Sequence, residues 1–264
     1  MTSILEEIAE YSRIRVQKSM THVSIEEMRE KALEADTGRQ PFAFESRLKP
    51  EGLSFISEVK KASPSKGIID PVFDYMEIAA DYEAAGADCL SVLTEPGWFL
   101  GSNGIFEDIR RKCNIPMLRK DFTVSEYQIY EAKIMGADAV LLICALLDEK
   151  TLKQYIETAD SLGLSTLVET HNENEIRTAV NAGARVIGVN NRNLKDFSVD
   201  FGNAGRLRKL IPDECIYVAE SGVRGPEDIR LLSEIGASAV LMGEVLMRSG
   251  NKAETLKTLK EAAL

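Results

Sequence analysis

Charged side chains recur at the ends of short apolar segments of this chain. They are Glu58, Lys60, Lys120, Glu169, Asn190, Arg192 and Glu220, the asparagine being the one uncharged member. Any one of them alone is explained as well by a surface salt bridge. Burying the whole set at one place would be costly unless the charges were paired or used. Opposite charges at close range also shift pKa values, as acid–base catalysis at neutral pH requires.

Small residues follow the last two apolar segments and predict an anion site. Ser221 and Gly222 come after one segment, and Gly243 and Glu244 after the other. Backbone N–H groups exposed at such turns bind phosphate in many barrel enzymes. Ordinary turn chemistry is the alternative explanation of these glycines. Glu244 would serve through its backbone N–H, with its carboxylate turned away.

Apolar side chains near the same segment ends predict a slot for a flat ligand part. They are Phe99 with its neighbour Trp98, Phe122 and Leu194. Each one alone is explained equally well by packing, but together with the charges they favour an apolar group bound next to a phosphate.

Eight short apolar segments alternate with amphipathic helical stretches, and this alternation predicts the fold. The segments are 53–60, 89–94, 115–122, 139–145, 165–170, 185–191, 216–221 and 239–243. A Gly-Ala pair precedes every second segment, which indicates a repeat of two strand–helix units. Strict alternation of this kind predicts an α/β fold, a (β/α)8 TIM barrel, whose strand ends gather the polar residues at one mouth. An open doubly wound sheet is the alternative, but no GxGxxG follows the first segment.

The chain has 264 residues, enough for one large α/β domain. Residues 1–48 look helical but have too few apolar residues for a separate core. We therefore expect a helical cap over 1–48 within the same domain as a barrel over 49–264.

Composition excludes several classes of function. The net charge of −10 argues against binding to nucleic acid. The longest apolar stretch, 139–147, is too short to span a membrane, and the first residues are acidic, unlike a signal peptide. The four cysteines are far apart, and the two histidines, His22 and His171, belong to no metal-ligand pattern. We expect a cytoplasmic protein without metal or cofactor, a monomer or weak homodimer, that binds a small phosphorylated molecule.

Seven segments of the chain, in order, resemble the indole-3-glycerol-phosphate synthase family of tryptophan biosynthesis. They are ISEVKKASPSKG (56–67), LTEPGWFLGS (93–102), PMLRKDF (116–122), LVETHN (167–172), IGVNNRNL (187–194), VAESGV (218–223) and LMGEVLMR (241–248). The resemblance covers essentially the whole chain. It implies a lyase that closes 1-(2-carboxyphenylamino)-1-deoxyribulose 5-phosphate to indole-3-glycerol phosphate, with loss of carbon dioxide and water.

The resemblance also implies roles for individual residues. Lys120 looks like the general acid that protonates the ketone oxygen, and Glu169 like the acid–base partner in the dehydration. Lys60 is similar to the lysine that contacts the substrate carboxylate, and Glu58 to its electrostatic partner. Glu220 resembles an interior acid of the family. The remaining site residues implied are Asn190 and Arg192 for positioning, Ser63, Ser221, Gly222, Gly243 and Glu244 for phosphate, and Phe99, Phe122, Leu141 and Leu194 for the anthranilate slot.

Two departures and three alternatives accompany this resemblance. Leu100 stands where the family commonly has a polar or small residue, and Arg13 where a lysine is usual. The alternatives are a phosphosugar isomerase, an aldolase that forms a Schiff base through Lys120 or Lys60, and a barrel that only binds phosphorylated ligands. We also expect the loop KKASPSKG (60–67) to be mobile and to close over substrate.

Overall fold

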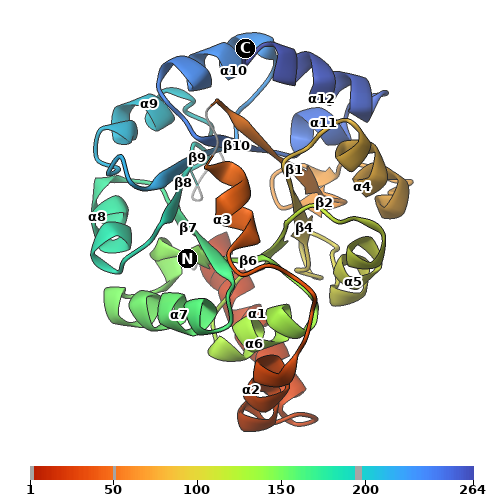
Figure 1. The fold of residues 1–264 in the computed structure, drawn as a ribbon, viewed down its shortest axis with the longest axis vertical. Helices are drawn as coiled ribbons and strands as arrows, with labels where there is room; N and C mark the ends of the chain where they lie inside the picture. The colour runs from red at the N-terminus through yellow and green to blue at the C-terminus, as the bar shows by residue number, and fades with distance from the viewer. Residues whose placement is uncertain (1–2, 50–51, 194–197) are drawn as a thin grey trace.

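The computed structural model describes residues 3–49, 52–193 and 198–264. Within them, eight parallel strands close into a barrel in the spatial order β1-β10-β9-β8-β7-β6-β5-β4 (Figure 1). The strands are β1 (Ser54–Val59), β4 (Cys89–Leu93), β5 (Met117–Lys120), β6 (Ala139–Ile143), β7 (Ser165–Thr170), β8 (Val186–Asn190), β9 (Ile216–Glu220) and β10 (Ala239–Met242). Each lies inside one of the eight apolar segments, so the predicted TIM barrel is confirmed.

Helices surround the barrel and connect its strands (Figure 1). They are α4 (Tyr75–Ala84), α5 (Asn103–Lys112), α6 (Glu126–Ile134), α7 (Glu149–Ser161), α8 (Glu173–Asn181), α9 (Gly202–Arg208), α10 (Pro226–Glu234), α11 (Glu244–Met247) and α12 (Lys252–Glu261), with a 3-10 turn, η1 (Cys144–Leu146). A short antiparallel hairpin, β2 (Ala62–Ser63) with β3 (Gly67–Ile68), lies in the loop after β1 and was not predicted. In the part of the chain that the structure describes, no helix is both long and apolar enough to cross a membrane.

Alternation along the strands separates two cores. Ile56, Leu118, Leu167 and Val218 are buried in one cluster inside the barrel, whereas their neighbours in sequence pack outward against the helices. The residue two positions further along each of these strands has its side chain on the same inner face. On β1, β5, β7 and β9 that residue is Glu58, Lys120, Glu169 and Glu220 respectively. The inner face of the barrel is therefore apolar toward the amino ends of the strands and charged at their carboxyl ends.

The N-terminal segment packs against both ends of the barrel. It contains α1 (Ile4–Met20), α2 (Ile25–Glu34) and α3 (Ala43–Leu48), of which α3 was not predicted. Phe44 and Leu48 of α3 join the interior cluster, and the backbone N–H of Phe42 donates to Gly163 ahead of β7, so α3 covers the amino ends of the strands. Helix α1 lies across the opposite end, and α2 lies beside α6 (Figure 1).

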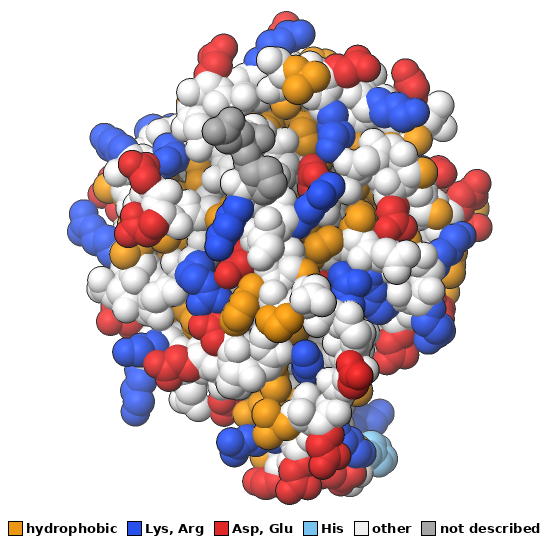
Figure 2. Space-filling model, in the orientation of Figure 1, with side chains coloured by type: hydrophobic (Ala, Val, Ile, Leu, Met, Phe, Trp, Pro, Cys, Tyr) orange, Lys and Arg blue, Asp and Glu red, His pale blue; other side chains and the backbone are white. Residues whose placement is uncertain are grey.

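The face of the molecule that α3 occupies carries acidic and basic side chains side by side (Figure 2). Hydrophobic side chains on this face are scattered among them. A mixed surface of this kind does not present the clustered cations that a phosphate backbone requires.

Asp138, just before β6, joins the N-terminal segment to the barrel. Its fully buried carboxylate accepts hydrogen bonds from Arg39 Nε at 2.8 Å, Arg110 Nη1 at 3.0 Å and the backbone N–H of Met117 at 2.8 Å. We expect Asp138→Asn to lower the free energy of unfolding by about 3 kcal/mol, because it leaves two guanidinium groups without their shared anion.

Urea denaturation measures this effect. Asp213→Asn is the matched control, because Asp213 pairs with Arg208 at 3.0 Å while 96% of its side chain is exposed. Loss of the Asp213 charge should change the free energy of unfolding by less than about 1 kcal/mol. Equal effects of the two variants would show that the buried cluster does not hold the segment in place.

Candidate active site

A cavity of about 580 Å³ opens at the carboxyl end of the barrel. Its lining includes every described residue of the predicted site, which the structure therefore brings together from eight strand ends and their loops. These are Glu58, Lys60, Ser63, Phe99, Lys120, Phe122, Leu141, Glu169, Asn190, Arg192, Glu220, Ser221, Gly222, Gly243 and Glu244. Leu194, the remaining predicted residue, lies outside the described residues.

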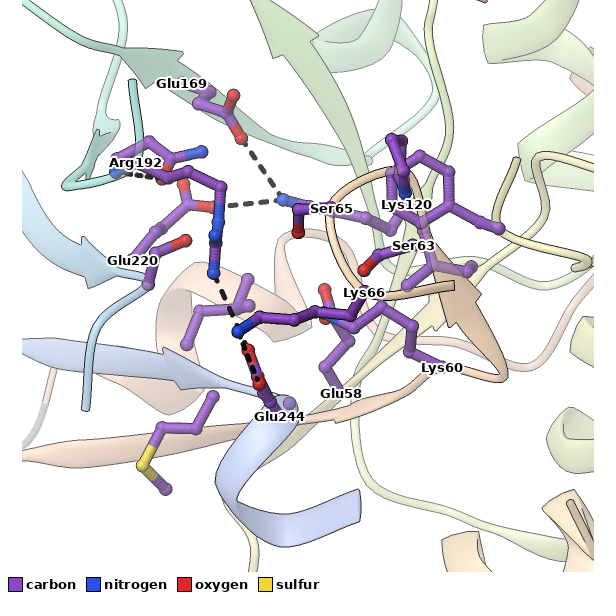
Figure 3. A pocket seen from close by; sticks show the side chains of 18 of the residues that line it. Glu58, Lys60, Ser63, Ser65, Lys66, Lys120, Glu169, Arg192, Glu220 and Glu244 are labelled. Carbon is purple, nitrogen blue, oxygen red and sulfur yellow. Dashed lines mark hydrogen bonds and ion pairs between the residues drawn. The ribbon is translucent and has the colours of Figure 1, made fainter. Parts of the chain in front are cut away.

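Lys120 occupies the centre of the charged layer (Figure 3). Its Nζ lies 3.2 Å from Glu169 Oε2 and 3.0 Å from Glu220 Oε2, so one ammonium bridges carboxylates from β7 and β9. All three side chains are at most 12% exposed. The site thus has a proton donor and two proton acceptors within hydrogen-bond reach of one another on the cavity floor.

The three groups differ in protonation. Burial alone would lower the pKa of Lys120, but the charges of Glu220, Glu169 and Glu58 raise it, so the side chain is an ammonium at neutral pH. Burial opposes ionisation of Glu169 as well, yet Lys120 and His171 hold its pKa below the ordinary value. Burial raises the pKa of Glu220 to about 7, and the neighbouring charge of Glu169 adds to this. At neutral pH the site therefore presents an acid, Lys120, beside a base, Glu169.

A second lysine–carboxylate pair lies on β1 and in the loop after it. Lys60 Nζ donates to Glu58 Oε1, and both side chains are largely buried. The facing residue is Gly243, at the end of β10. A Cβ at that position would lie 2.5 Å from Glu58 Oε1 and 3.1 Å from Lys60 Nζ. Glycine is therefore needed there because the pair lies directly against the backbone of the last strand.

Basic side chains from the loops after β1, β8 and β10 gather at one end of the cavity. Lys66 Nζ lies 3.4 Å from the carboxylate of Glu244, and Arg192 Nη2 lies 3.7 Å from it (Figure 3). Arg248 Nε lies 3.2 Å from the same carboxylate. Ser63, Ser221, Gly222 and Gly243 also line the cavity. Three cations around one carboxylate make this end attractive to a dianion such as phosphate.

Apolar side chains form another part of the cavity wall. The rings of Phe99 and Phe122 lie 6.0 Å apart, and Leu141 of β6 lines the cavity with them. Trp98 is not part of the lining; it packs edge-on against Tyr11 of α1, at 5.6 Å between ring centroids. The wall is suited to a flat apolar group rather than to a second charged one.

Helix α1 contributes to the cavity, which was not predicted from the sequence. Ile4, Leu5 and Ile8 of α1 line the cavity at the carboxyl end of the barrel and pack against the apolar cluster inside it. The sequence did contain a signal, because these apolar residues recur at helical spacing after Ser3. Ser3 and Glu6 form the cap at the start of α1. That spacing showed an apolar helix face but not which end of the barrel the face would cover.

Comparison with known proteins agrees with this geometry. Residues 5–259 match the family model of indole-3-glycerol phosphate synthase. The chain is 54% identical to the indole-3-glycerol phosphate synthase of Ruminiclostridium cellulolyticum, over 98% of this chain and all of that one. It is 50% identical to the same enzyme of Endomicrobium trichonymphae, over 98% and 100% of the two chains. The chain belongs to the indole-3-glycerol phosphate synthase family.

More distant solved structures share the fold of this indole-3-glycerol phosphate synthase family member. KGPDC from Streptococcus mutans superposes with a TM-score of 0.64 at 12% identity, covering 81% of this chain and 98% of that one. Thiamine phosphate pyrophosphorylase from Pyrococcus furiosus gives 0.60 at 14% identity, over 80% and 95%. At these identities the likeness concerns the barrel alone.

Gly188 on β8 allows a test of the position of Glu220 inside the barrel. A Cβ at Gly188 would lie 2.1 Å from Glu220 Oε1, so Gly188→Ala must displace the Glu220 carboxylate from Lys120. We expect kcat to fall about 10²-fold, as for other small misplacements of catalytic groups. Steady-state kinetics check this against Gly250→Ala, where a Cβ meets nothing within 4 Å. Equal kcat values in the two variants would contradict the placement of Glu220.

Proposed function

We propose that this cavity converts 1-(2-carboxyphenylamino)-1-deoxyribulose 5-phosphate to indole-3-glycerol phosphate, carbon dioxide and water, which makes the chain a carbon–carbon lyase of the carboxy-lyase class. The observation that carries the proposal is the position of the Lys120 ammonium. It lies between Glu169 and Glu220 on the cavity floor, with an apolar wall and a basic phosphate end in the same cavity. We also propose that the protein is cytoplasmic, as expected from the sequence.

Ring closure is the first step. The ring carbon that carries the carboxylate attacks the ketone carbon, and the electron pair of the C=O bond moves to its oxygen. The Lys120 ammonium donates a proton to that oxygen and gives a hydroxyl group. Asn190 and Arg192 position the chain of the substrate, and the wall of Phe99 and Phe122 holds the aromatic ring at the distance the attack requires.

Decarboxylation and dehydration follow. The bond from the ring to the carboxylate breaks, its electron pair restores the aromatic ring, and carbon dioxide leaves. The hydroxyl group then leaves as water with a proton from Lys60, which Glu58 holds in place. Glu169 removes a proton from the neighbouring carbon, and the indole is complete. Two protons are given to oxygen and one is taken from carbon, so a turnover starting from the ionised carboxylate takes up one proton.

The protonation of Lys120 disfavours the aldolase alternative. A Schiff base needs a neutral amine, whereas the surrounding carboxylates raise the pKa of Lys120 and keep it an ammonium. Borohydride reduction with the substrate present tests this directly. Covalent attachment of the substrate to Lys120 or Lys60 would support the aldolase and contradict the synthase.

Incubation with the carboxyphenylamino substrate tests the function itself. We expect indole absorbance to appear with carbon dioxide in a one-to-one ratio. The same preparation should show no turnover with phosphosugars that lack the aromatic ring, because the apolar wall then has nothing to hold. A folded protein that released neither product from the carboxyphenylamino substrate would contradict the proposal.

A further inference from the structure

His171 lies behind Glu169, on the side away from the cavity. It follows the last residue of β7, and its Nε2 is 3.4 Å from Glu169 Oε1. Its Nδ1 is 3.0 Å from Glu175 Oε2 on α8. The side chains of Glu169, His171 and Glu175 are 5%, 14% and 19% exposed. A carboxylate, an imidazole and a second carboxylate thus form a row from the cavity floor toward the surface.

The local structure fixes the direction of the imidazole ring. Glu175 also accepts a hydrogen bond from the backbone N–H of His171 at 2.8 Å and one from Asn172 Nδ2 at 2.6 Å. The side chain of Asn203 donates to the carbonyl of His171 at 3.3 Å. Nε2 is buried without a hydrogen-bond partner among the described residues, so a small rotation of the ring is enough to hydrogen-bond it to Glu169.

The surrounding charges favour a proton on this ring. Glu169 faces it from β7, Glu175 from α8 and Glu220 from β9, and Lys120 lies on the far side of Glu169. Burial alone would lower the pKa of His171, but the hydrogen bond to Glu175 and these carboxylates raise it. The thiol of Cys144 donates to the backbone carbonyl of Glu175.

The proposed reaction requires a path by which a proton can reach Lys120 while substrate is bound. Lys120 loses its proton to the ketone oxygen, and the substrate then fills the mouth through which solvent would reach it. Glu169, which touches both Lys120 and the row, is the group by which a proton can arrive from behind. This inference rests on the proposed function, because that reaction discharges Lys120 in ring closure and delivers the carbon proton to Glu169 only in the last step, after which the row returns that proton to solvent.

We propose that His171 is a positioning residue that also relays protons between solvent and Glu169. The protonated ring passes its Nε2 proton to Glu169, and Glu169 passes a proton 3.2 Å to Lys120, while Nδ1 keeps the proton that it donates to Glu175. The neutral ring then turns, takes up a proton from solvent beside Glu175 and becomes an imidazolium again, so one proton enters the row and one leaves it. His171 does not line the cavity, and it acts on the substrate only through Glu169.

His171→Ala, His171→Gln and the control His22→Ala test the relay. His22 is the other histidine of the chain and is exposed. We expect His171→Ala to lower kcat at least tenfold with KM within twofold, and added imidazole to restore the rate in a saturable way. His171→Gln should stay slow, because its amide can donate to Glu169 but cannot carry a proton onward. Wild type and His22→Ala should not respond to imidazole.

Other results would overturn the relay. A normal rate in His171→Gln, or no rescue of His171→Ala by imidazole, would show that the ring only holds Glu169 in place. Glu175→Gln is the second variant if His171→Ala fails to fold, and its kcat should fall with a larger solvent deuterium isotope effect than wild type; an unchanged effect would contradict the relay. Inactive wild type refutes the proposed function, whereas active wild type with unaffected His171 variants refutes the relay alone.

Discussion

Lys120→Met is expected to lower kcat by about 10³-fold or more, while a substrate analogue still binds. The methionine cannot protonate the ketone oxygen or stabilise the charge that develops on it, and each of these effects alone is worth about 10²-fold or more. The phosphate end and the apolar wall do not include Lys120, so they should keep most of the binding free energy. Steady-state kinetics and calorimetric titration of the analogue measure the two quantities separately.

Loss of the ammonium also leaves Glu169 and Glu220 buried without their shared cation, so stability needs its own control. Lys120→Arg keeps a positive charge between the two carboxylates, but guanidinium does not release a proton at neutral pH. We expect this variant to fold and to remain nearly as slow as Lys120→Met. Lys112→Met, at the exposed end of α5, should behave as wild type. Near-normal turnover in Lys120→Arg would contradict the assignment of Lys120 as the general acid.

Glu169→Gln is expected to separate carbon dioxide release from indole formation. The amide cannot remove the proton from carbon in the last step, so indole formation should fall by about 10²- to 10⁴-fold. In the proposed mechanism ring closure and decarboxylation depend on Lys120, so they should continue until the intermediate accumulates. Rapid quench with mass spectrometry should then find a species heavier than the product by one water.

The control for this variant is Glu173→Gln, two residues before Glu175 on α8. The side chain of Glu173 is 62% exposed. The control should release carbon dioxide and form indole at equal rates. If Glu169→Gln slowed both products in parallel and no hydrated species appeared, Glu169 would act in ring closure instead of dehydration.

The fold and the gathering of charges followed from periodicity in the sequence. Residues two apart on a strand share a face, so Leu118 inside the barrel places Lys120 at its inner rim, and Leu167 does the same for Glu169. Closure of eight such strands then brings distant residues together, as the 3.2 Å contact between Lys120 and Glu169 illustrates. Nothing beyond strand alternation and the barrel rule was needed for this part.

Features that depend on how separate elements dock were not predictable in this way. The apolar face of α1 fits either end of a barrel equally well, and tertiary packing alone decided that Ile4 and Leu5 reach the cavity. The contact of His171 with Glu175 depends on the angle at which α8 leaves β7, set by the Asn172 cap. The identity of the substrate came from the resemblance to the family, because charges and an apolar wall define a class of ligand and not one molecule.

A crystal structure with indole-3-glycerol phosphate bound tests the central claim most directly. The indole ring should lie against Phe99 and Phe122, the phosphate beside the backbone N–H groups of Gly222 and Gly243, and Lys120 Nζ within about 4 Å of the indole carbon that carries the glycerol chain. A phosphate bound next to Lys120, or a ring lying outside the apolar wall, would contradict it.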